Sequence, residues 1–296
     1  MTDHAKGLWI GVGGILVLTP DALIIRLIHG NAWTVTFWRG ILVGAVLLGF
    51  FALKERGNFW AMLRGMGWYG VGITLLYALG SWSFNLAIKT TVVANVLLII
   101  SSLPLLAALL SLIVLREAVP LRTWLAIAIA GIGIAVIFAE SIAGGRWVGE
   151  LFAFLSALTL AVQFVLIRKA KAINFVPTIG LGGLLAAVVM LFVTDPFEVP
   201  VSDYWLLALM GLVIQPISFA AINLAPRYLP VPEVGLIMLL ETVLGPMWVW
   251  TVLNEVPSPQ TFVGGGFVLT ALVCNAVLSL RAASTPQAPL TASEVG

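Results

Sequence analysis

Charged residues are scarce in this chain. Asp, Glu, Lys and Arg make up 9% of its 296 residues, whereas a soluble domain carries about 25%, so the chain cannot cover itself with a water-exposed surface. Hydrophobic residues make up 61%, and the mean hydropathy is +1.10. The composition predicts an integral membrane protein surrounded by the lipid bilayer. The net charge of +2 is too small to indicate a nucleic-acid partner.

Cysteine and histidine are also nearly absent. The single cysteine, Cys274, lies in an apolar run, which excludes an internal disulfide and a cysteine-based metal site. His4 and His29 lie at or beyond the predicted membrane ends, and neither is clustered with acids. An intramembrane enzyme would need paired acids, a histidine or a metal constellation at one depth, and none is visible. We therefore expect no metal, no cofactor and no enzymatic activity.

What the chain does contain is a series of apolar runs, each close to the ~20 residues that a spanning helix needs. Breakers or charges separate them. They predict an all-α membrane protein of ten transmembrane helices, at 8–28, 33–53, 66–88, 91–115, 121–139, 147–168, 177–193, 203–225, 232–253 and 259–280. Residues 282–296, rich in Ser, Thr, Pro and Ala, predict a disordered tail.

The distribution of lysine and arginine predicts the orientation. Eleven of these residues fall in loops or helix ends on the side of the N-terminus, and three fall on the other side. Because cytoplasmic loops carry the excess of positive charge, both termini are predicted to be cytoplasmic.

Two pairs of stretches repeat within the chain. Asn85 to Glu117 matches Asn223 to Glu255 without a gap, 138 residues later, and Gly7 to Arg26 matches Gly149 to Arg168, 142 residues later. Each repeat spans five helices, and because five is odd the two halves insert in opposite directions. This is the inverted duplication of transporters whose binding site lies at the midplane, between the halves. The predicted domains are a first repeat at 1–140 and a second at 147–281.

The repeated segments also carry a resemblance. NLAIKTTVVANVLLIISSLPLLAALLSLIVLREAVP (85–120) and LLETVLGPMWVWTVLNEVP (239–257) each close a long apolar helix on a Glu shortly before a Pro. In these motifs the chain resembles the drug/metabolite transporter superfamily, in its ten-helix form with paired EamA-type repeats, and it looks most like bacterial exporters of aromatic and other amino acids. The helix-four proline of the family is present as Pro104, whereas the aligned position in the second half is Thr242.

The resemblance implies an inner-membrane exporter of amino acids or related small metabolites. Such a protein works by alternating access around a central cavity, as a monomer with a small-molecule substrate. Because relatives carry other cargo, two alternatives stay open: proton-coupled efflux of lipophilic cationic drugs, and transport of metabolites such as sugar phosphates. The choice between facilitated diffusion and proton coupling is open as well.

Polar side chains within a span are costly and normally face the bundle interior or a cavity. Residues four apart share one helix face, and two repeat-related helices each carry such a stripe. A cavity between the halves would need both, although hydrogen bonds that hold helices together are the alternative use. The predicted lining residues are Tyr77, Ser81 and Asn85 in the third helix and Gln215, Phe219 and Asn223 in the eighth.

Three further polar residues lie within spans of the first, second and sixth helices. Asp21 and Arg39 both lie at a depth of about 10 Å from the same side, at 1.5 Å per residue. An ion pair between them is predicted, and a role of Arg39 in binding a substrate carboxylate is the alternative. Gln163 is the repeat counterpart of Asp21 and is a further candidate for substrate binding.

Glu241 lies near the middle of the ninth helix, where its repeat counterpart is Leu103. A buried acid can bind a cation or a proton, or it can be hydrogen-bonded as part of the structure. Trp82 and Trp248 lie deep enough to wall a cavity, although packing is the commoner use of tryptophan. Glu117 and Glu255, at helix ends, are expected to cap or tie a neighbouring loop. The predicted hinges are the prolines that interrupt helices: Pro20, Pro104, Pro216 and Pro246.

Overall fold

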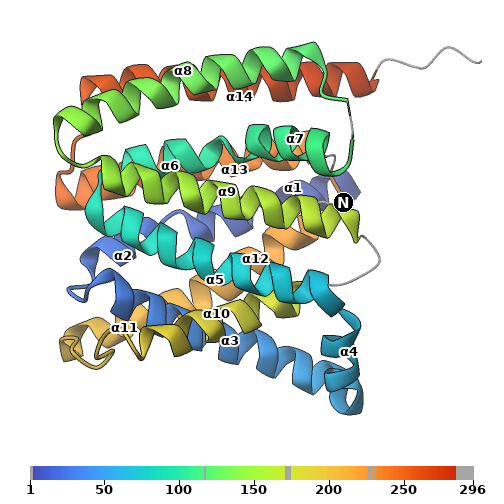
Figure 1. The fold of residues 1–296 in the computed structure, drawn as a ribbon, viewed down its shortest axis with the longest axis vertical. Helices are drawn as coiled ribbons and strands as arrows, with labels where there is room; N and C mark the ends of the chain where they lie inside the picture. The colour runs from blue at the N-terminus through green and yellow to red at the C-terminus, as the bar shows by residue number, and fades with distance from the viewer. Residues whose placement is uncertain (1–2, 117, 171–174, 226–227, 230, 285–296) are drawn as a thin grey trace, which may run out of the picture.

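The computed structural model describes residues 3–116, 118–170, 175–225, 228–229 and 231–284. Within these ranges the chain is helical and contains no strand. The helices run back and forth across a slab, as Figure 1 shows. The first five passes are α1 (Asp3–Leu18) with α2 (Asp21–Leu27), α3 (Ala32–Glu55), α5 (Gly67–Thr90), α6 (Val93–Ser101) with α7 (Leu103–Val114), and α8 (Leu121–Ala143).

The second five passes repeat this order. They are α9 (Trp147–Lys169), α10 (Val176–Met190), α11 (Tyr204–Ala208) continued by the π-helix η3 (Leu209–Ile214) and α12 (Gln215–Leu224), α13 (Val231–Leu253), and α14 (Pro259–Ser284). Three short helices lie in connections: η1 (Arg56–Asn58), α4 (Phe59–Gly65) and η2 (Val201–Asp203).

The structure confirms the predicted ten-helix fold. Nine of the passes in the described residues are long and apolar enough to cross a membrane, and α10, with 15 residues, is a shorter apolar helix. We call the end of the bundle that holds the first and last described residues the terminal face, and the opposite end the far face. The predicted tail lies outside the described residues except at its start, where α14 continues to Ser284.

The helices pack in pairs that the inverted repeat relates. α5 packs against α9 and α1 packs against α12, so the third pass of each half lies against the first pass of the other half. The pairs α3–α10 and α8–α14 each join equivalent passes of the two halves. Figure 1 shows the α8–α14 pair as an outer layer, with α3 and α10 at the opposite side of the bundle.

Glycines allow the backbones in two of these pairs to approach. A Cβ added at Gly183 would lie 2.7 Å from the carbonyl oxygen of Gly40, and one at Gly40 would lie 2.3 Å from that of Gly183. Gly133 and Gly264 are related in the same way, at 2.4 and 2.6 Å. Small residues at helix contacts are how membrane helices pack closely when lipid offers no hydrophobic driving force.

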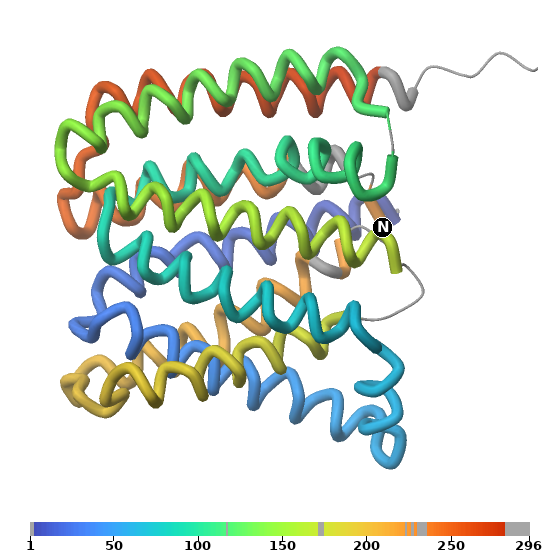
Figure 2. The backbone as a smooth tube through the Cα atoms, in the orientation of Figure 1, coloured from blue at the N-terminus to red at the C-terminus, as the bar shows by residue number. Residues whose placement is uncertain are grey.

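Three of the four predicted hinge prolines coincide with interruptions of helices. Figure 2 shows the path of the backbone. Pro20 separates α1 from α2, and Pro104 lies in the first turn of α7, directly after the break at Ser102. Pro216 opens α12 after the π-helix. A proline lacks the backbone N–H and clashes with the carbonyl one turn earlier. The wider turn of the π-helix before Pro216 relieves this clash. At Pro246 the prediction differs from the structure, because α13 continues through it without a break.

Candidate functional site

A cavity of about 990 Å³ lies between the two halves. Its walls come from α1, α2, α3, α5, α6 and α7 of the first half and from α9, α10, η3, α12 and α13 of the second. The lining extends from mid-bundle, at Asp21 and Gln215, to exposed Lys54 at the terminal face. Among the described residues no lining side chain comes from 22–38, 85–96 or 243–258. The cavity therefore faces the terminal face and is closed toward the far face.

A buried ion pair forms one end of the cavity. Arg39 Nη1 lies 2.9 Å from Asp21 Oδ2, as the depth of the two residues predicts. Arg39 also donates to Asn85 Oδ1 at 3.3 Å, and its guanidinium lies 5.2 Å from the ring centre of Phe84. Gln215 Nε2 donates to Asp21 Oδ1 at 3.0 Å. The charge of Arg39 is thus neutralised by the protein itself, and Asp21 has a second partner.

The predicted stripes of α5 and α12 meet at the cavity. Tyr77 and Phe219 contact edge to face, with ring centres 6.5 Å apart, and both line the cavity. Ser81 and Gln163 line it as well. Gln163 donates to the carbonyl oxygen of Thr159 at 3.3 Å. The Oε1 atom of Gln215 is buried and has no hydrogen-bond partner in the described structure.

Glu241 also lines the cavity, from α13. It is half-buried and lies within electrostatic range of Asp21 and Arg39. In the described part of the chain no hydrogen bond or ion pair joins its carboxylate to another group, in contrast to Asp21. Glu241 is therefore an acidic side chain that reaches the cavity without a hydrogen-bond or ion-pair partner in the described structure.

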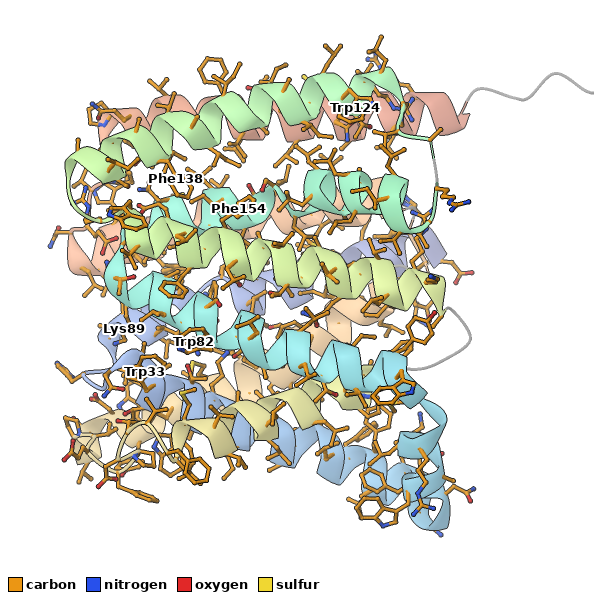
Figure 3. The ribbon with its side chains drawn as sticks, in the orientation of Figure 1. Trp33, Trp82, Lys89, Trp124, Phe138 and Phe154 are labelled. Atoms are coloured by element: carbon orange, nitrogen blue, oxygen red, sulfur yellow. The ribbon has the colours of Figure 1, made fainter. Side chains whose placement is uncertain are left out.

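Four of the predicted lining residues are placed differently or lie outside the description. Asn85 is fully buried, away from the cavity, and donates to Thr36 Oγ1 at 2.9 Å. Trp82 stacks on Trp33 with ring centres 5.6 Å apart and does not line the cavity. Figure 3 labels both residues, which come from α5 and α3. Trp248 donates from Nε1 to Thr19 Oγ1 at 3.1 Å, at the α1–α2 break, and is not a lining residue either. The side chain of Asn223 lies outside the described residues.

The far face is closed by polar contacts between the halves. Arg26 donates from Nε and Nη2 to Glu255 Oε2, at 3.1 and 2.8 Å, and from Nη2 to the carbonyl of Thr91 at 2.9 Å. The other carboxylate oxygen of Glu255 accepts from the backbone N–H of Val93 at 2.8 Å. We call Arg26, Glu255, Thr91 and Val93 the far-face latch. It ties the end of α2 to the start of α6 and to the loop after α13.

Other contacts reinforce this closure. The backbone N–H of His29 donates to Asp203 Oδ2 at 2.7 Å, which joins α2 to η2. Lys89 Nζ donates to the carbonyl of Ile28, and Trp38 Nε1 donates to the carbonyl of Pro196 at 2.8 Å. Lys89 is visible in Figure 3 near the end of α5.

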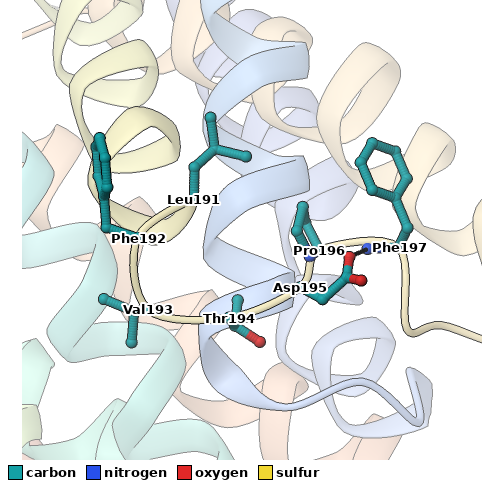
Figure 4. Close-up of a pocket in the computed structure, with 7 residues that line it drawn as sticks. All are labelled: Leu191, Phe192, Val193, Thr194, Asp195, Pro196 and Phe197. Carbon is teal, nitrogen blue, oxygen red and sulfur yellow. Dashed lines mark hydrogen bonds between the residues drawn. The ribbon is translucent and has the colours of Figure 1, made fainter.

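A second hollow lies on the far face around residues 191–197 (Figure 4). One turn of chain forms all of it, stabilised by the N–H of Phe197 donating to Asp195 Oδ1 at 2.9 Å. Because it is lined by a single segment and lies open, it cannot enclose a substrate as the central cavity can.

Sequence reasoning missed several residues of these sites. Thr36 accepts from Asn85, which in turn contacts Arg39, and Phe84 lies against the Arg39 guanidinium. Neither residue type is unusual in a membrane span, so nothing in the sequence is a reason to select them. From the sequence, Arg26 is recognised only as the end of a repeated stretch, because its ion pair with Glu255 depends on how the two halves meet. Glu150 is fully buried; an acid in the first turn of a predicted span was its only signal, because its repeat counterpart is Leu8.

Two stretches, residues 8–139 and 147–277, match the EamA-like transporter family, one in each half. Eleven solved chains are similar in structure. One of them, described as "Crystal structure of protein", superposes with a TM-score of 0.65 at 20% identity, over 94% of this chain and 99% of that chain. At this identity the likeness concerns the fold alone. No curated protein matches the sequence.

Proposed function

The chain belongs to the EamA-like transporter family, a family of membrane transporters of small metabolites, and we propose that it exports amino acids or related amines from the bacterial cytoplasm across the inner membrane. The terminal face is then cytoplasmic, in agreement with the excess of Lys and Arg on that side. In this orientation the structure is the inward-facing state of an alternating-access cycle, with its cavity open to the cytoplasm and the far-face latch closed.

The observation that carries the proposal is the unpartnered carboxylate of Glu241 in the central cavity. Asp21 and Arg39 neutralise each other at 2.9 Å, so an ionised Glu241 leaves one negative charge uncompensated. A buried charge is stable only when it is paired. An ammonium group is a monovalent cation that also donates hydrogen bonds, which Glu241 and the bare Oε1 of Gln215 can accept.

The rest of the cavity suits an apolar body. Aromatic and aliphatic side chains dominate the lining, among them Phe84, Phe164 and Phe219. The volume of about 990 Å³ lies at the upper end of the range for small-molecule sites. The cations among the lining residues are Arg39, which is paired, and Lys54 at the mouth. Among the described lining residues a sugar phosphate would find no free cation at the centre, so these contacts favour amine-bearing substrates.

A second candidate is the efflux of lipophilic cationic drugs, because Glu241 would recognise their charge equally well. The two candidates differ in what else the substrate presents. An amino acid also carries a carboxylate, and the hydroxyls of Tyr77 and Ser81 are among the donors of the cavity wall that can bind it. Replacing Tyr77 by Phe should therefore weaken amino-acid transport and leave the transport of simple lipophilic cations unchanged.

Counterflow into proteoliposomes tests the proposal. Vesicles preloaded with one of a panel of amino acids or lipophilic cations should take up the labelled compound, with and without an imposed pH gradient. Glu241→Gln, which keeps the size and removes the charge, should reduce counterflow by at least tenfold. Glu198→Gln, at an exposed acid of the far-face loop, should not. Folded protein that transports no amine would refute the proposal, and an unchanged rate in Glu241→Gln would remove Glu241 from the site.

A further inference from the structure

A second buried acid lies outside the transport cavity, near the far face. Glu150, in the first turn of α9, is fully buried together with four other side chains that carry oxygen. We call these residues the Glu150 cluster: Thr91 after α5, Asn95 in α6, Ser141 in α8, Glu150 in α9 and Thr261 in α14. Both halves of the protein contribute to it.

The hydrogen bonds of Glu150 are unevenly distributed. Its Oε1 atom accepts from Thr91 Oγ1 at 2.5 Å, from Ser141 Oγ at 2.5 Å and from Asn95 Nδ2 at 3.0 Å. Its Oε2 atom is buried and has no partner in the described structure. Thr261 completes the cluster by donating to Asn95 Oδ1 at 2.7 Å. One carboxylate oxygen is thus saturated and the other is bare.

All three groups that contact Oε1 are donors, and hydrogen bonds donated to a carboxyl oxygen favour the charged form of the group. No ion pair of the described residues includes Glu150. The charged groups nearby are already engaged. Arg146 lies 3.7 Å from Glu140, which also accepts from Ser258, and Arg26 is bound to Glu255. A buried charge without a partner is expensive, so the cluster lacks one positive charge.

We propose that the Glu150 cluster binds a monovalent metal cation of the size of sodium. Carboxylate, hydroxyl and amide oxygens are the ligands that hard cations prefer. The hydroxyls of Thr91 and Ser141 keep lone pairs for a cation while they donate to Glu150. The cluster holds a single carboxylate, so a monovalent cation would neutralise its charge, whereas a divalent cation would leave one positive charge in excess. A cation beside Oε2 gives the bare oxygen its partner.

The location gives the cation a consequence for the transport cycle. The side chain of Thr91 binds Glu150, while its carbonyl accepts from Arg26 of the far-face latch. Sodium in the cluster therefore stabilises the turn between α5 and α6 to which the latch is attached. Occupancy favours the state whose far face is closed. This binding is independent of what the transporter carries.

Thermal unfolding of the purified full-length protein tests the site without any substrate. Sodium chloride is titrated against N-methylglucamine chloride at constant ionic strength, with potassium and lithium in parallel. The midpoint Tm should rise by about 3–8 °C and saturate with sodium, as expected when a ligand binds only the folded state. Glu150→Gln should lose the sodium-dependent rise. Glu241→Gln should keep it, because Glu241 lines the transport cavity and is not part of the Glu150 cluster.

If Glu150→Gln does not fold, Thr91→Val and Ser141→Ala give the same information with the carboxylate in place. Each removes one hydroxyl ligand and should raise the sodium concentration at half-effect by roughly tenfold. A Tm that is equal in sodium and in N-methylglucamine would overturn the proposal. So would a Tm that responds to pH and not to sodium. A failure of counterflow leaves this result unaffected, so the two proposals can fail separately.

Discussion

Glu255→Gln should open the far face of the transporter. The carboxylate of Glu255 accepts two hydrogen bonds from Arg26, at 3.1 and 2.8 Å, and one from the N–H of Val93 at 2.8 Å. The substitution keeps the shape and one acceptor oxygen, and removes the charge. The far-face latch is weakened, while the cavity residues are unchanged.

The geometry sets the size of the effect. A hydrogen bond to a charged group contributes about 1.5–3 kcal/mol, but the Arg26 and Glu255 side chains are 22% and 21% exposed, which screens their attraction. The amide oxygen introduced by the substitution can still accept from the N–H of Val93. We therefore expect the closed state to lose about 1–3 kcal/mol, which corresponds to a 5- to 150-fold change in the ratio of the two states.

Cysteine labelling in intact cells measures this ratio. Leu97 is buried at the cavity wall, one turn after Val93 in α6. In a Cys274→Ser background, a cysteine introduced at Leu97 should react with a membrane-impermeant maleimide added outside the cell only when the far face opens. Glu255→Gln should raise that rate about 5- to 150-fold, in proportion to the change in the ratio of states. Arg146→Gln is the matched control, because its contact with Glu140 is 3.7 Å long and Arg146 is 46% exposed. The reasoning would be refuted if both variants, folded and inserted, labelled at the same rate.

Three other changes should have distinct effects. Arg39→Gln leaves Asp21 buried without its charge partner and should destabilise the protein by about 3–5 kcal/mol, measured as a lower Tm; adding Asp21→Asn should recover part of the loss. Gly183→Val places side-chain atoms against the Gly40 carbonyl and should reduce folded yield by size-exclusion chromatography, whereas Gly49→Val, with nothing within 4 Å of its Cβ position, should not. Trp248→Phe loses one hydrogen bond to Thr19, about 1 kcal/mol, and should leave counterflow within about twofold of the parent.

Much of the fold follows from the sequence because the bilayer restricts the possible answers. A span must be apolar and close to ~20 residues long, and all ten predicted spans coincide with helical passes of the described chain. The boundaries differ by a few residues, mainly because helices such as α14 extend beyond the apolar stretch. The Asp21–Arg39 contact could be expected since two opposite charges at one depth of a bilayer have few other partners.

The residues around the cavity were predictable only in part, because helical spacing identifies a face but not its neighbour at each depth. Asn85 shares the face of Tyr77 and Ser81, yet it lies one turn closer to the far face, where the cavity has closed and Arg39 and Thr36 fill the space. Trp248 stands two turns from Glu241 on α13 and meets the α1–α2 break instead. Where the cavity ends is a property of all the packed helices together.

The repeat explains why the cavity can be symmetric in position and asymmetric in chemistry. Several pairs of repeat-related residues line it from both halves, among them Asp21 with Gln163, Tyr77 with Gln215, Ser81 with Phe219, and Leu103 with Glu241. Equivalent positions face the cavity because the inverted halves pack by the same contacts.

Two of these pairs contain an acid, and in each of them only one member is acidic: Asp21 in the first and Glu241 in the second. Asp21 forms the ion pair with Arg39, and Glu241 lies within electrostatic range of both residues. The counterparts, Gln163 and Leu103, are uncharged. A substrate that binds its ammonium group to Glu241 must direct the rest of its body away from the charged wall, toward the aromatic and aliphatic residues. The shared scaffold thus permits access from either face, while the divergence of the two halves fixes the orientation of the substrate within it.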